Sequence, residues 1–356
     1  MTPTAITAST RAYEKWLRTQ LGKQIVENDL RKKHKKMAEG PFPFLRATYW
    51  RWAETILDLC PELAGAPAVL AVGDIHLENF GTWRDADGRL VWGVNDFDEA
   101  AEMPYPLDLV RLATSAVLGS PGAEATDDIC MQLLEGYARG LADPHAIVLD
   151  QDYAWLRQLV VVSDKERADF WRKMETLAAG GKPPTNYVKA LAAAMPERGI
   201  KMAVLPRTAG AGSLGRPRWV GIGQWHGAPI MREAKAMVPS AWTRANRRGR
   251  DALQWHRLAT GRYRSPDPWL ALSGNIATRR LSPNNRKIEA AETPFLTSRK
   301  MLRAMGRDLA AIHLGIADRS KAIAHDLGDR KRNWLPSAVE RAADFVRRDC
   351  RAWRKQ

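Results

Sequence analysis

The stretch AVLAVGDIHLENF, residues 68–80, and the later stretch NDFD, residues 95–98, decide the fold of this chain. The first stretch opens with an apolar run that predicts a short buried strand. Between the two stretches, the polar turn at residues 84–88 contains Asp-Gly and separates two apolar runs, a pattern typical of a β-hairpin. We therefore expect the hairpin to bring Asp96 back toward Asp74, which follows the buried strand.

The acidic and amide side chains at these positions suit phosphoryl transfer. Asp74 can orient an attacking hydroxyl and accept its proton, and the side-chain oxygen of Asn79 can bind a Mg²⁺ ion. Asp96 can bridge the same ion to the phosphates, because Mg²⁺ usually takes one or two carboxylates together with phosphate oxygens. Asp98 is interpreted either as a further metal ligand or as a structural residue. The alternative for Asp74 and Asp96 is a purely structural role in turns.

A glycine-rich segment, Gly210-Ala211-Gly212-Ser213-Leu214-Gly215, lies between two predicted strands. Its glycines would let the backbone approach a phosphate closely, with N–H groups pointing at it. A glycine turn that only joins two strands would show the same pattern. In the predicted strand 229–236, a lysine could hold nucleotide phosphates as a point charge, and the alternative is an ordinary surface lysine. The candidate nucleotide-binding residues are Gly210, Gly212, Ser213, Gly215 and Lys235.

The set Asp74-x-His76-x-x-Asn79, followed by Asp96-Phe97-Asp98, resembles the catalytic and metal loops of aminoglycoside and choline phosphotransferases, which belong to the protein-kinase-like superfamily. Residues 104–112 resemble the segment in which an aspartate braces the catalytic loop, and residues 309–313 resemble the helix end that precedes this loop. More closely, five separated motifs resemble the bacterial family known as domain of unknown function 2252. These motifs are residues 43–46, 73–81, 95–100 and 210–215, and Lys235.

The resemblance implies an α+β, two-lobed protein-kinase-like fold in circularly permuted order. A standard kinase chain has its glycine loop and lysine strand before the catalytic loop, whereas here the catalytic loop lies near residue 74 and the glycine loop near residue 210. The implied units are a helical lobe with the catalytic and metal loops, a sheet-rich nucleotide-covering lobe inserted late, and helices completing the first lobe. Their ranges are residues 1–195, 196–292 and 293–356.

The resemblance also bears on two individual positions. His76 is a candidate catalytic residue, but related loops use this histidine structurally, so a hydrogen bond that stabilises the loop is the favoured role. Kinases usually carry a helix glutamate that pairs with the lysine. In the predicted helix over residues 250–257 the corresponding residue is Asp251 or Gln254, so this ion pair is expected to be replaced or missing.

The remaining elements are expected from periodicity, prolines and glycines. One helix is expected over residues 10–38, ending in the basic run 31–36, which we interpret as solvated. Prolines at residues 41 and 43 are expected to break it. Elsewhere we expect a helix through Leu57, mostly helices over 106–195 with breaks at 121–122, 180–181 and 183–184, strands at 202–205, 218–224, 229–236 and 276–281, and helices at 297–325 and 336–353.

The composition indicates the size of the fold, the charge of the partners and the compartment of the protein. The chain has 356 residues, enough for two lobes, and a net charge of +15 that attracts anionic partners such as nucleotides. Its three cysteines are far apart and form no metal or redox motif, which fits a reducing compartment. No apolar run reaches the roughly 20 residues of a membrane span, and no signal peptide is evident. We therefore expect a cytoplasmic protein.

The predicted function is an ATP- and Mg²⁺-dependent phosphotransferase that moves a γ-phosphoryl group to a hydroxyl acceptor which the sequence does not identify. Alternatives within this fold are a nucleotide-binding pseudokinase and a nucleotidyl transferase. Gly73-Asp74-x-His76 also opens the metal set of binuclear metallophosphoesterases, but residues 274–276 lack the histidine which that set needs. A nucleic-acid-binding protein, suggested by the charge and the 14 tryptophans, is possible but not favoured.

Overall fold

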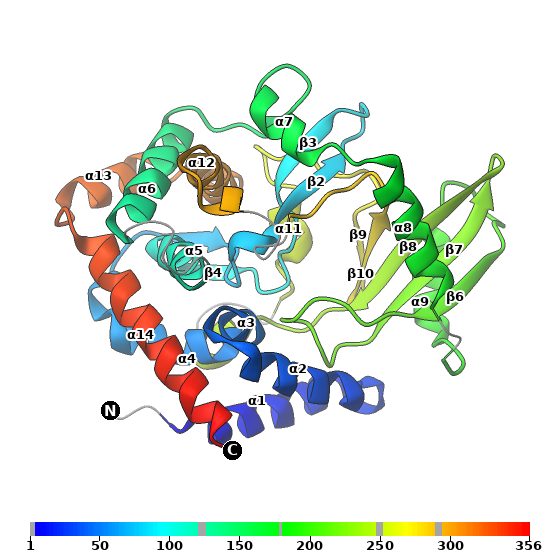
Figure 1. The fold of residues 1–356 in the computed structure, drawn as a ribbon, viewed down its shortest axis with the longest axis horizontal. Coiled ribbons are helices and arrows are strands. Elements are labelled where there is room, and N and C mark those ends of the chain that lie inside the picture. Colours follow the sequence, from blue (N-terminus) through cyan, green and yellow to red (C-terminus); the bar gives the residue numbers. More distant parts are fainter. Residues whose placement is uncertain (1–3, 120–125, 178–179, 247–251, 289–293) are drawn as a thin grey trace.

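The computed structural model describes residues 4–119, 126–177, 180–246, 252–288 and 294–356, and it shows a mixed α+β architecture. Helices occupy one side of the molecule, and an antiparallel sheet with its own small helices occupies the other (Figure 1). Between them lie two short sheets that carry the stretches around residues 74 and 96. In the described ranges no helix is both long and apolar enough to cross a bilayer.

The N-terminal helices differ from the sequence prediction in two ways. The single helix expected over residues 10–38 is wrong, because the chain breaks at Gly22, whose φ is +54°, into two helices. The helix does end just before the two prolines, as expected, but residues 41–46 are themselves helical, which was not expected. Gly40 ends the second helix, and the prolines lie in the first turn of a new one, where missing N–H donors cost little. The helices are α1 (Ile6–Leu21), α2 (Glu27–Glu39), α3 (Pro41–Ala47) and α4 (Tyr49–Leu59).

The predicted strand and hairpin in the middle of the chain are confirmed. Strand β1 (Ala68–Ala71) pairs antiparallel with β4 (Ala101–Pro104). Strands β2 (Phe80–Arg84) and β3 (Leu90–Val94) form the hairpin, and β5 (Ile147–Val148) pairs with the outer side of β3. The segments that follow β1 and β3 meet where the N–H of Asn95 donates to the carbonyl oxygen of Asn79 at 3.0 Å.

The strands predicted after residue 200 lie in one five-stranded antiparallel sheet, as expected. Its order is β6-β7-β8-β10-β9, so β9 and β10 form a second hairpin added to the edge of β8. Buried Met174 packs against Val220 and Met231, which joins α8 to this sheet (Figure 1). The strands are β6 (Met202–Pro206), β7 (Arg218–Trp225), β8 (Ala228–Ala236), β9 (Ala271–Ser273) and β10 (Ile276–Leu281).

The later helices follow the prediction except at one position. The helix expected over residues 297–325 ends at Leu314 and a second begins at Ser320, so that prediction is wrong, whereas the helix over 336–353 is confirmed. The break expected at residues 121–122 lies outside the described residues. These helices are α5 (Pro106–Gly119), α6 (Thr126–Ala142), α7 (Ala154–Val160), α8 (Asp164–Glu175), α9 (Thr185–Ala193), α10 (Ala241–Asn246), α11 (Trp255–Ala259), α12 (Arg299–Leu314), α13 (Ser320–Asp329) and α14 (Trp334–Arg354).

Helices α6 and α12 pack so closely that glycine is needed where they cross. A Cβ atom on Gly306 would overlap the carbonyl oxygen of Leu133 and lie 2.8 Å from the backbone nitrogen of Tyr137. On the facing helix, a Cβ atom on Gly136 would overlap the backbone of Arg303. Because backbone lies on both sides of the contact, a side chain cannot be accommodated by a rotamer change. This crossing fixes the position of α12.

We predict that Gly306→Ala lowers the free energy of unfolding by about 2 kcal/mol or more, because the added methyl group forces the two helices apart. Gly328→Ala is the matched control, since this exposed helical glycine has open space around its Cα atom. The control should be neutral or up to about 1 kcal/mol more stable. Urea denaturation measures both, and equal stabilities of the two variants would contradict the close helix crossing.

Candidate functional site

The loop after β1 is held by one buried carboxylate, that of Asp108 on α5. Its two oxygens accept the backbone N–H groups of Val72 and Gly73, at 2.7 and 2.9 Å. The ring of His313, at the end of α12, contacts the same carboxylate at 3.1 Å and is itself hydrogen-bonded to Tyr137 at 2.8 Å. A carboxylate with several such partners in the interior holds the loop rigidly. The bracing aspartate expected from the sequence is thereby found.

The end of the β2–β3 hairpin is fixed in a similar way. Asp308 on α12 accepts the backbone N–H of Val94 at 2.8 Å. The guanidinium of Arg264 bridges the other oxygen of Asp308, at 2.7 Å, and the carbonyl oxygen of Val94, at 2.6 Å. The chain leaves this clamp directly into Asn95 and Asp96. Helix α12 therefore helps to position both the loop that carries Asp74 and the stretch that carries Asp96.

His76 and Asn79 stabilise the loop through a capping box. The Nδ1 atom of His76 accepts the N–H of Glu78 at 3.1 Å, and the Oδ1 atom of Asn79 accepts the N–H of His76 at 2.6 Å. Burial, together with the nearby charge of Arg46, holds the pKa of His76 well below its usual range, so the ring is neutral. These contacts match the structural role favoured for His76. They leave the Asn79 oxygen one further lone pair for a metal ion.

Asp74 is held from one side by a buried arginine. Arg111 contacts the Oδ1 atom of Asp74 and also donates to the carbonyl oxygen of Leu45 at 2.9 Å. Its guanidinium lies 4.9 Å from the ring centroid of Tyr49 and 5.1 Å from that of Trp52. Burial raises the pKa of the Asp74 carboxyl to about 7, although the charge of Arg111 acts in the opposite direction. The carboxyl thus titrates near neutral pH.

The glycine-rich segment between β6 and β7 lies against Asp74. A Cβ atom on Gly212 would stand 2.9 Å from the Oδ2 atom of Asp74, so the bare backbone permits the approach. The backbone of Gly210 has a φ of +75°, a conformation that favours glycine. The hydroxyl of Ser213 accepts a hydrogen bond from Arg218 at 2.8 Å. Gly215 is different, because it packs on Leu30 of α2 and does not line the cavity of the site.

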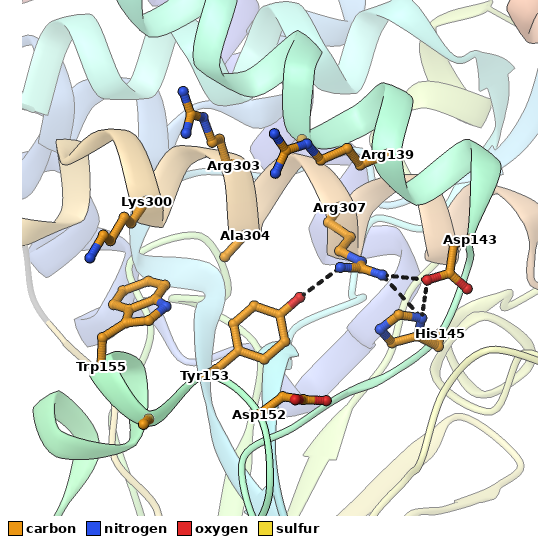
Figure 2. Close-up of a pocket in the computed structure, with 12 residues that line it drawn as sticks. Arg139, Asp143, His145, Asp152, Tyr153, Trp155, Lys300, Arg303, Ala304 and Arg307 are labelled. Carbon is orange, nitrogen blue, oxygen red and sulfur yellow. Dashed lines mark hydrogen bonds and ion pairs between the residues drawn. The ribbon is translucent and has the colours of Figure 1, made fainter.

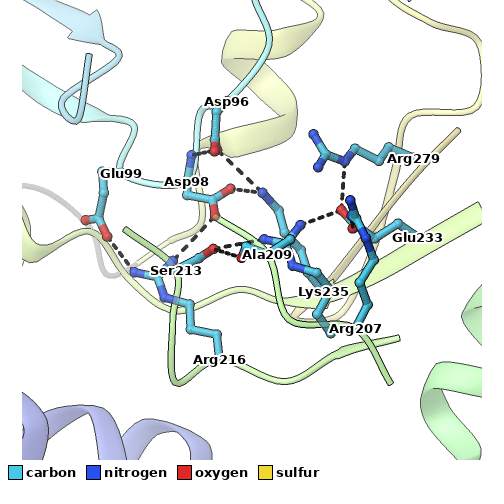
Figure 3. Close-up of polar contacts among 11 residues, drawn as sticks. Asp96, Asp98, Glu99, Arg207, Ala209, Ser213, Arg216, Glu233, Lys235 and Arg279 are labelled. Atoms are coloured by element: carbon cyan, nitrogen blue, oxygen red, sulfur yellow. Dashed lines mark hydrogen bonds and ion pairs between the residues drawn. The ribbon is translucent and has the colours of Figure 1, made fainter. Parts of the chain in front are cut away.

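Lys235 on β8 points at the acidic pair that follows the hairpin (Figure 3). Its ammonium group contacts Asp98 and lies 3.5 Å from Asp96. Burial raises the pKa of the Asp96 carboxyl, but Lys235, a hydrogen bond from Asp98 and nearby arginines lower it more. The pKa of Asp96 therefore lies below its usual range. Burial and the Asp96 charge raise the pKa of Asp98. The Oδ2 atom of Asp98 has no hydrogen-bond partner among the described residues.

The expected partner of Lys235 is replaced. Gln254 only precedes the short helix α11, so the helix predicted over residues 250–257 is confirmed at 255–257 and wrong at 252–254, and Asp251 lies outside the described residues. Instead, Lys235 pairs with Asp96 and Asp98, which follow the hairpin. Beside Lys235, the fully buried Glu233 binds Arg218 at 2.6 Å, Arg279 at 2.8 Å and also Arg207 (Figure 3). Three cations around one carboxylate give this sheet a positive excess beneath the glycine segment.

Lys33 supports the glycine segment from below, and the prediction of a solvated basic run is wrong for this residue. Lys33 is 1% exposed, and its ammonium group donates to the carbonyl oxygen of Gly212 at 2.8 Å. Burial lowers the pKa of Lys33 to about 7. The helical pattern could have revealed it, since Lys33 lies three residues after Leu30 and four before Met37, on the buried stripe of α2.

These groups surround one small cavity of about 40 Å³. Such a volume holds a water molecule or an ion but no nucleotide. Among the described residues no three His, Cys, Asp or Glu side chains gather as a metal cage, so a cation here would need oxygens from Asn79 or a substrate as well. The Oδ2 atom of Asp98 accepts no hydrogen bond from the described residues, although Arg216 lies 3.8 Å away, so it is available as one such ligand. The lining is Arg46, Asp74, His76, Asn79, Asp96, Asp98, Glu99, residues 210–213, Arg216 and Lys287.

Several lining cations were missed by the sequence analysis. Arg216 binds Glu99 at 2.5 Å, and Arg46 binds Glu78 at 2.7 Å. Lys287 reaches the cavity because its backbone pairs with Gly81 beside the hairpin. Arg216 and Lys287 belong to no motif with fixed spacing, and Arg46, in the motif at residues 43–46, was not assigned to the site. Only the folded chain brings them to the loop around Asp74.

We predict that Asp108→Ala lowers the free energy of unfolding by about 3 to 5 kcal/mol, because two buried N–H groups and the ring of His313 lose their acceptor. Asp87→Ala is the control, since this side chain is 77% exposed and should change stability by less than about 0.5 kcal/mol. Chemical denaturation compares them. An Asp108→Ala variant as stable as the control would show that the carboxylate does not hold the loop.

Comparison with known proteins agrees with one of the two resemblances seen in the sequence. No curated protein and no solved structure matches the chain. A family model described as "Uncharacterized protein conserved in bacteria (DUF2252)" matches residues 25–175. This part includes the Asp74 loop, the hairpin and the acidic pair, and it ends before the glycine segment. Over these residues the chain is similar to that bacterial family, as its motifs predicted.

Proposed function

We propose that this protein is an ATP- and Mg²⁺-dependent phosphotransferase with a circularly permuted, two-lobed kinase-like fold. The observation that carries the proposal is the single cavity shared by Asp74, Asn79 and Asp96 with the glycine segment. The loop and hairpin come from the first third of the chain, whereas the glycine segment and Lys235 come from the later sheet. Catalysis of phosphoryl transfer depends on positioning and charge, which such a convergence supplies.

The proposed lobes correspond only in part to the spatial division of the fold, because α8 and α9, which precede residue 195, pack on the later sheet. Residues 1–195 would form the helical lobe with the reactive loops, residues 196–292 the sheet-rich lobe that covers the nucleotide, and residues 293–356 the helices that complete the first lobe. Two contacts support the permutation. His313 at the end of α12 touches Asp108, which holds the loop after β1, and β8 carries Lys235 to the acidic pair. In this proposal the connectivity differs from that of a standard kinase, while these contacts take the place of the equivalent kinase contacts.

Each site residue has a role in this proposal. The Oδ2 atom of Asp74 would accept the proton of the acceptor hydroxyl, because Arg111 holds the other oxygen. Oxygens of Asn79, Asp96 and Asp98 would hold Mg²⁺, which when bound neutralises phosphate charge. Lys235 and the backbone of the glycine segment would contact the phosphates.

Nucleotide binding requires the glycine segment to move. The cavity of about 40 Å³ is too small for a triphosphate, and two contacts close it. One joins Lys33 to the carbonyl oxygen of Gly212, and the other joins Lys235 to Asp98. On binding, the ammonium group of Lys235 would exchange a carboxylate for phosphate oxygens, and Asp98 would become free to take the metal ion. The structure therefore corresponds to a closed, nucleotide-free state in this proposal.

We predict different defects for Asp96→Asn and Asp74→Asn. Asp96→Asn should weaken binding of ATP with Mg²⁺ by about tenfold or more, because it removes a charged metal ligand. Asp74→Asn should bind the nucleotide normally but lose transfer by about a hundredfold or more, since it removes the base. Asp87→Asn, on an exposed turn, is the control for both.

Calorimetry with ATP and Mg²⁺ and transfer from γ-labelled ATP to a panel of hydroxyl acceptors measure these effects. Equal loss of ATP affinity in both folded variants would contradict the assigned roles. Label incorporated from α-labelled ATP would identify a nucleotidyl transferase instead. Nucleotide binding without label from either substrate would identify a pseudokinase, and no nucleotide binding at all would reject the proposal.

We also predict that the transfer rate rises with pH through about 7. Burial raises the pKa of Asp74 to about 7, so its carboxylate, the form that accepts a proton, predominates only above that pH. Lys33, whose pKa is also near 7, loses charge in the same range, so the profile should be repeated in Lys33→Met. A rise that persists in Lys33→Met assigns it to Asp74, whereas a flat or falling profile would contradict a base with this pKa.

A further inference from the structure

A second, larger cavity lies on the far side of α12, away from the candidate site. Its volume is about 640 Å³, within the range of small-molecule pockets, which is about 300 to 1,000 Å³. It lies between α6, α12 and the loop that leads into α7 (Figure 2). None of its lining residues lines the cavity around Asp74. Its chemistry is therefore independent of the proposed phosphotransferase site.

One wall of this cavity is a row of cations on α12. Lys300, Arg303 and Arg307 follow one another at spacings of three and four residues, so they lie on one face of the helix. Arg139 on α6 adds a fourth cation (Figure 2). The lining also contains two aspartates, which leaves an excess of two positive charges. Glu135, just outside the lining, reduces this excess to one.

The cations are unequally neutralised. Glu135 lies 2.8 Å from Arg303 and 2.5 Å from Arg139, so one carboxylate serves two guanidinium groups. Lys300 has no carboxylate partner among the described residues. Arg307 binds Asp143 at 2.7 Å, but the side chain of Asp143 is 72% exposed and lies toward solvent. The helix wall thus keeps a positive excess that suits a phosphate group, whose oxygens can engage cations of successive helical turns.

The opposite wall presents two aromatic rings. Tyr153, which precedes α7, and Trp155, in its first turn, point toward α12, and the hydroxyl of Tyr153 accepts a hydrogen bond from Arg307 at 3.1 Å (Figure 2). Tyr153 has a left-handed backbone, with φ 56° and ψ 41°, which is rare for a bulky residue and concentrates at ligand sites. Arg157 holds this loop by donating to the carbonyl oxygens of Leu149 and Asp150, at 2.7 and 2.8 Å.

We propose that this cavity binds a small molecule that joins a phosphate group to a flat ring, as a mononucleotide does. The phosphate would lie against Lys300 and Arg303, and the ring would stack on Trp155. Rings stack on tryptophan whatever their substituents, and the cations opposite would also face the ring. A purely anionic ligand would leave the aromatic wall unused, and a neutral aromatic ligand would leave Lys300 without a partner.

The proposal is tested by calorimetry of the full chain with AMP, ribose 5-phosphate and adenosine. AMP should bind about tenfold or more tightly than either fragment, since it alone uses both walls. Lys300→Ala, an exposed position, should weaken AMP about fivefold or more and reduce the salt dependence of binding. Trp155→Leu, which keeps an apolar side chain in the wall, should weaken AMP but leave ribose 5-phosphate unchanged.

Two controls separate this cavity from the rest of the molecule. Lys321→Ala, on the exposed face of α13, should leave AMP binding unchanged. Asp96→Asn should also leave it unchanged, because that residue lies in the other cavity. Circular dichroism and thermal unfolding confirm that each variant is folded. Three results would each overturn the proposal. They are full AMP affinity in both Lys300→Ala and Trp155→Leu, loss of AMP affinity only in Asp96→Asn, and absence of binding at about 1 mM AMP.

Discussion

The carboxylate of Asp108 is the group on which the site depends. It accepts the first N–H groups after β1 and contacts His313, so it connects α5, the loop that carries Asp74 and the end of α12 at one point in the interior. A buried charge is tolerated only when its hydrogen-bonding capacity is filled, which makes these partners mutually dependent. The position of Asp74, two residues beyond Val72, follows from this constraint.

Around that fixed loop, charge pairing determines how the later sheet docks. Lys235 contacts Asp98 and lies 3.5 Å from Asp96, Arg216 reaches Glu99, and Lys33 holds the glycine segment from below. Every one of these contacts joins segments far apart in the sequence. A buried cation is costly when its carboxylate partner is removed. The ion pairs of Lys235 and Arg216 therefore favour the closed site until another anion takes the place of the protein carboxylates. Phosphate oxygens are such a replacement in the function we propose.

Helix α12 connects the two cavities. Toward the interior, Asp308 clamps the end of the hairpin and His313 braces Asp108, while Lys300 and Arg307 line the larger cavity on the other face. Close glycine contacts with α6 leave little freedom for the helix to shift. The same rigid element therefore positions the loops that carry Asp74 and Asp96 and one wall of a second pocket, and the crossing with α6 supports both.

Local pattern alone determined the strand before Asp74, the hairpin over residues 80–94 and the strands of the later sheet, because alternating apolar residues and turn residues act over a few positions. It also indicated which acidic, amide and glycine residues could carry chemistry. Pattern failed at residues 41–46, where prolines begin a helix, and at Lys33, a charged residue on a buried stripe. Only the tertiary structure decided that Asp98 pairs with Lys235, that Gly215 packs on Leu30, and that Arg111 holds Asp74. These outcomes depend on charges and volumes contributed by distant segments, and no short stretch of sequence contains that information.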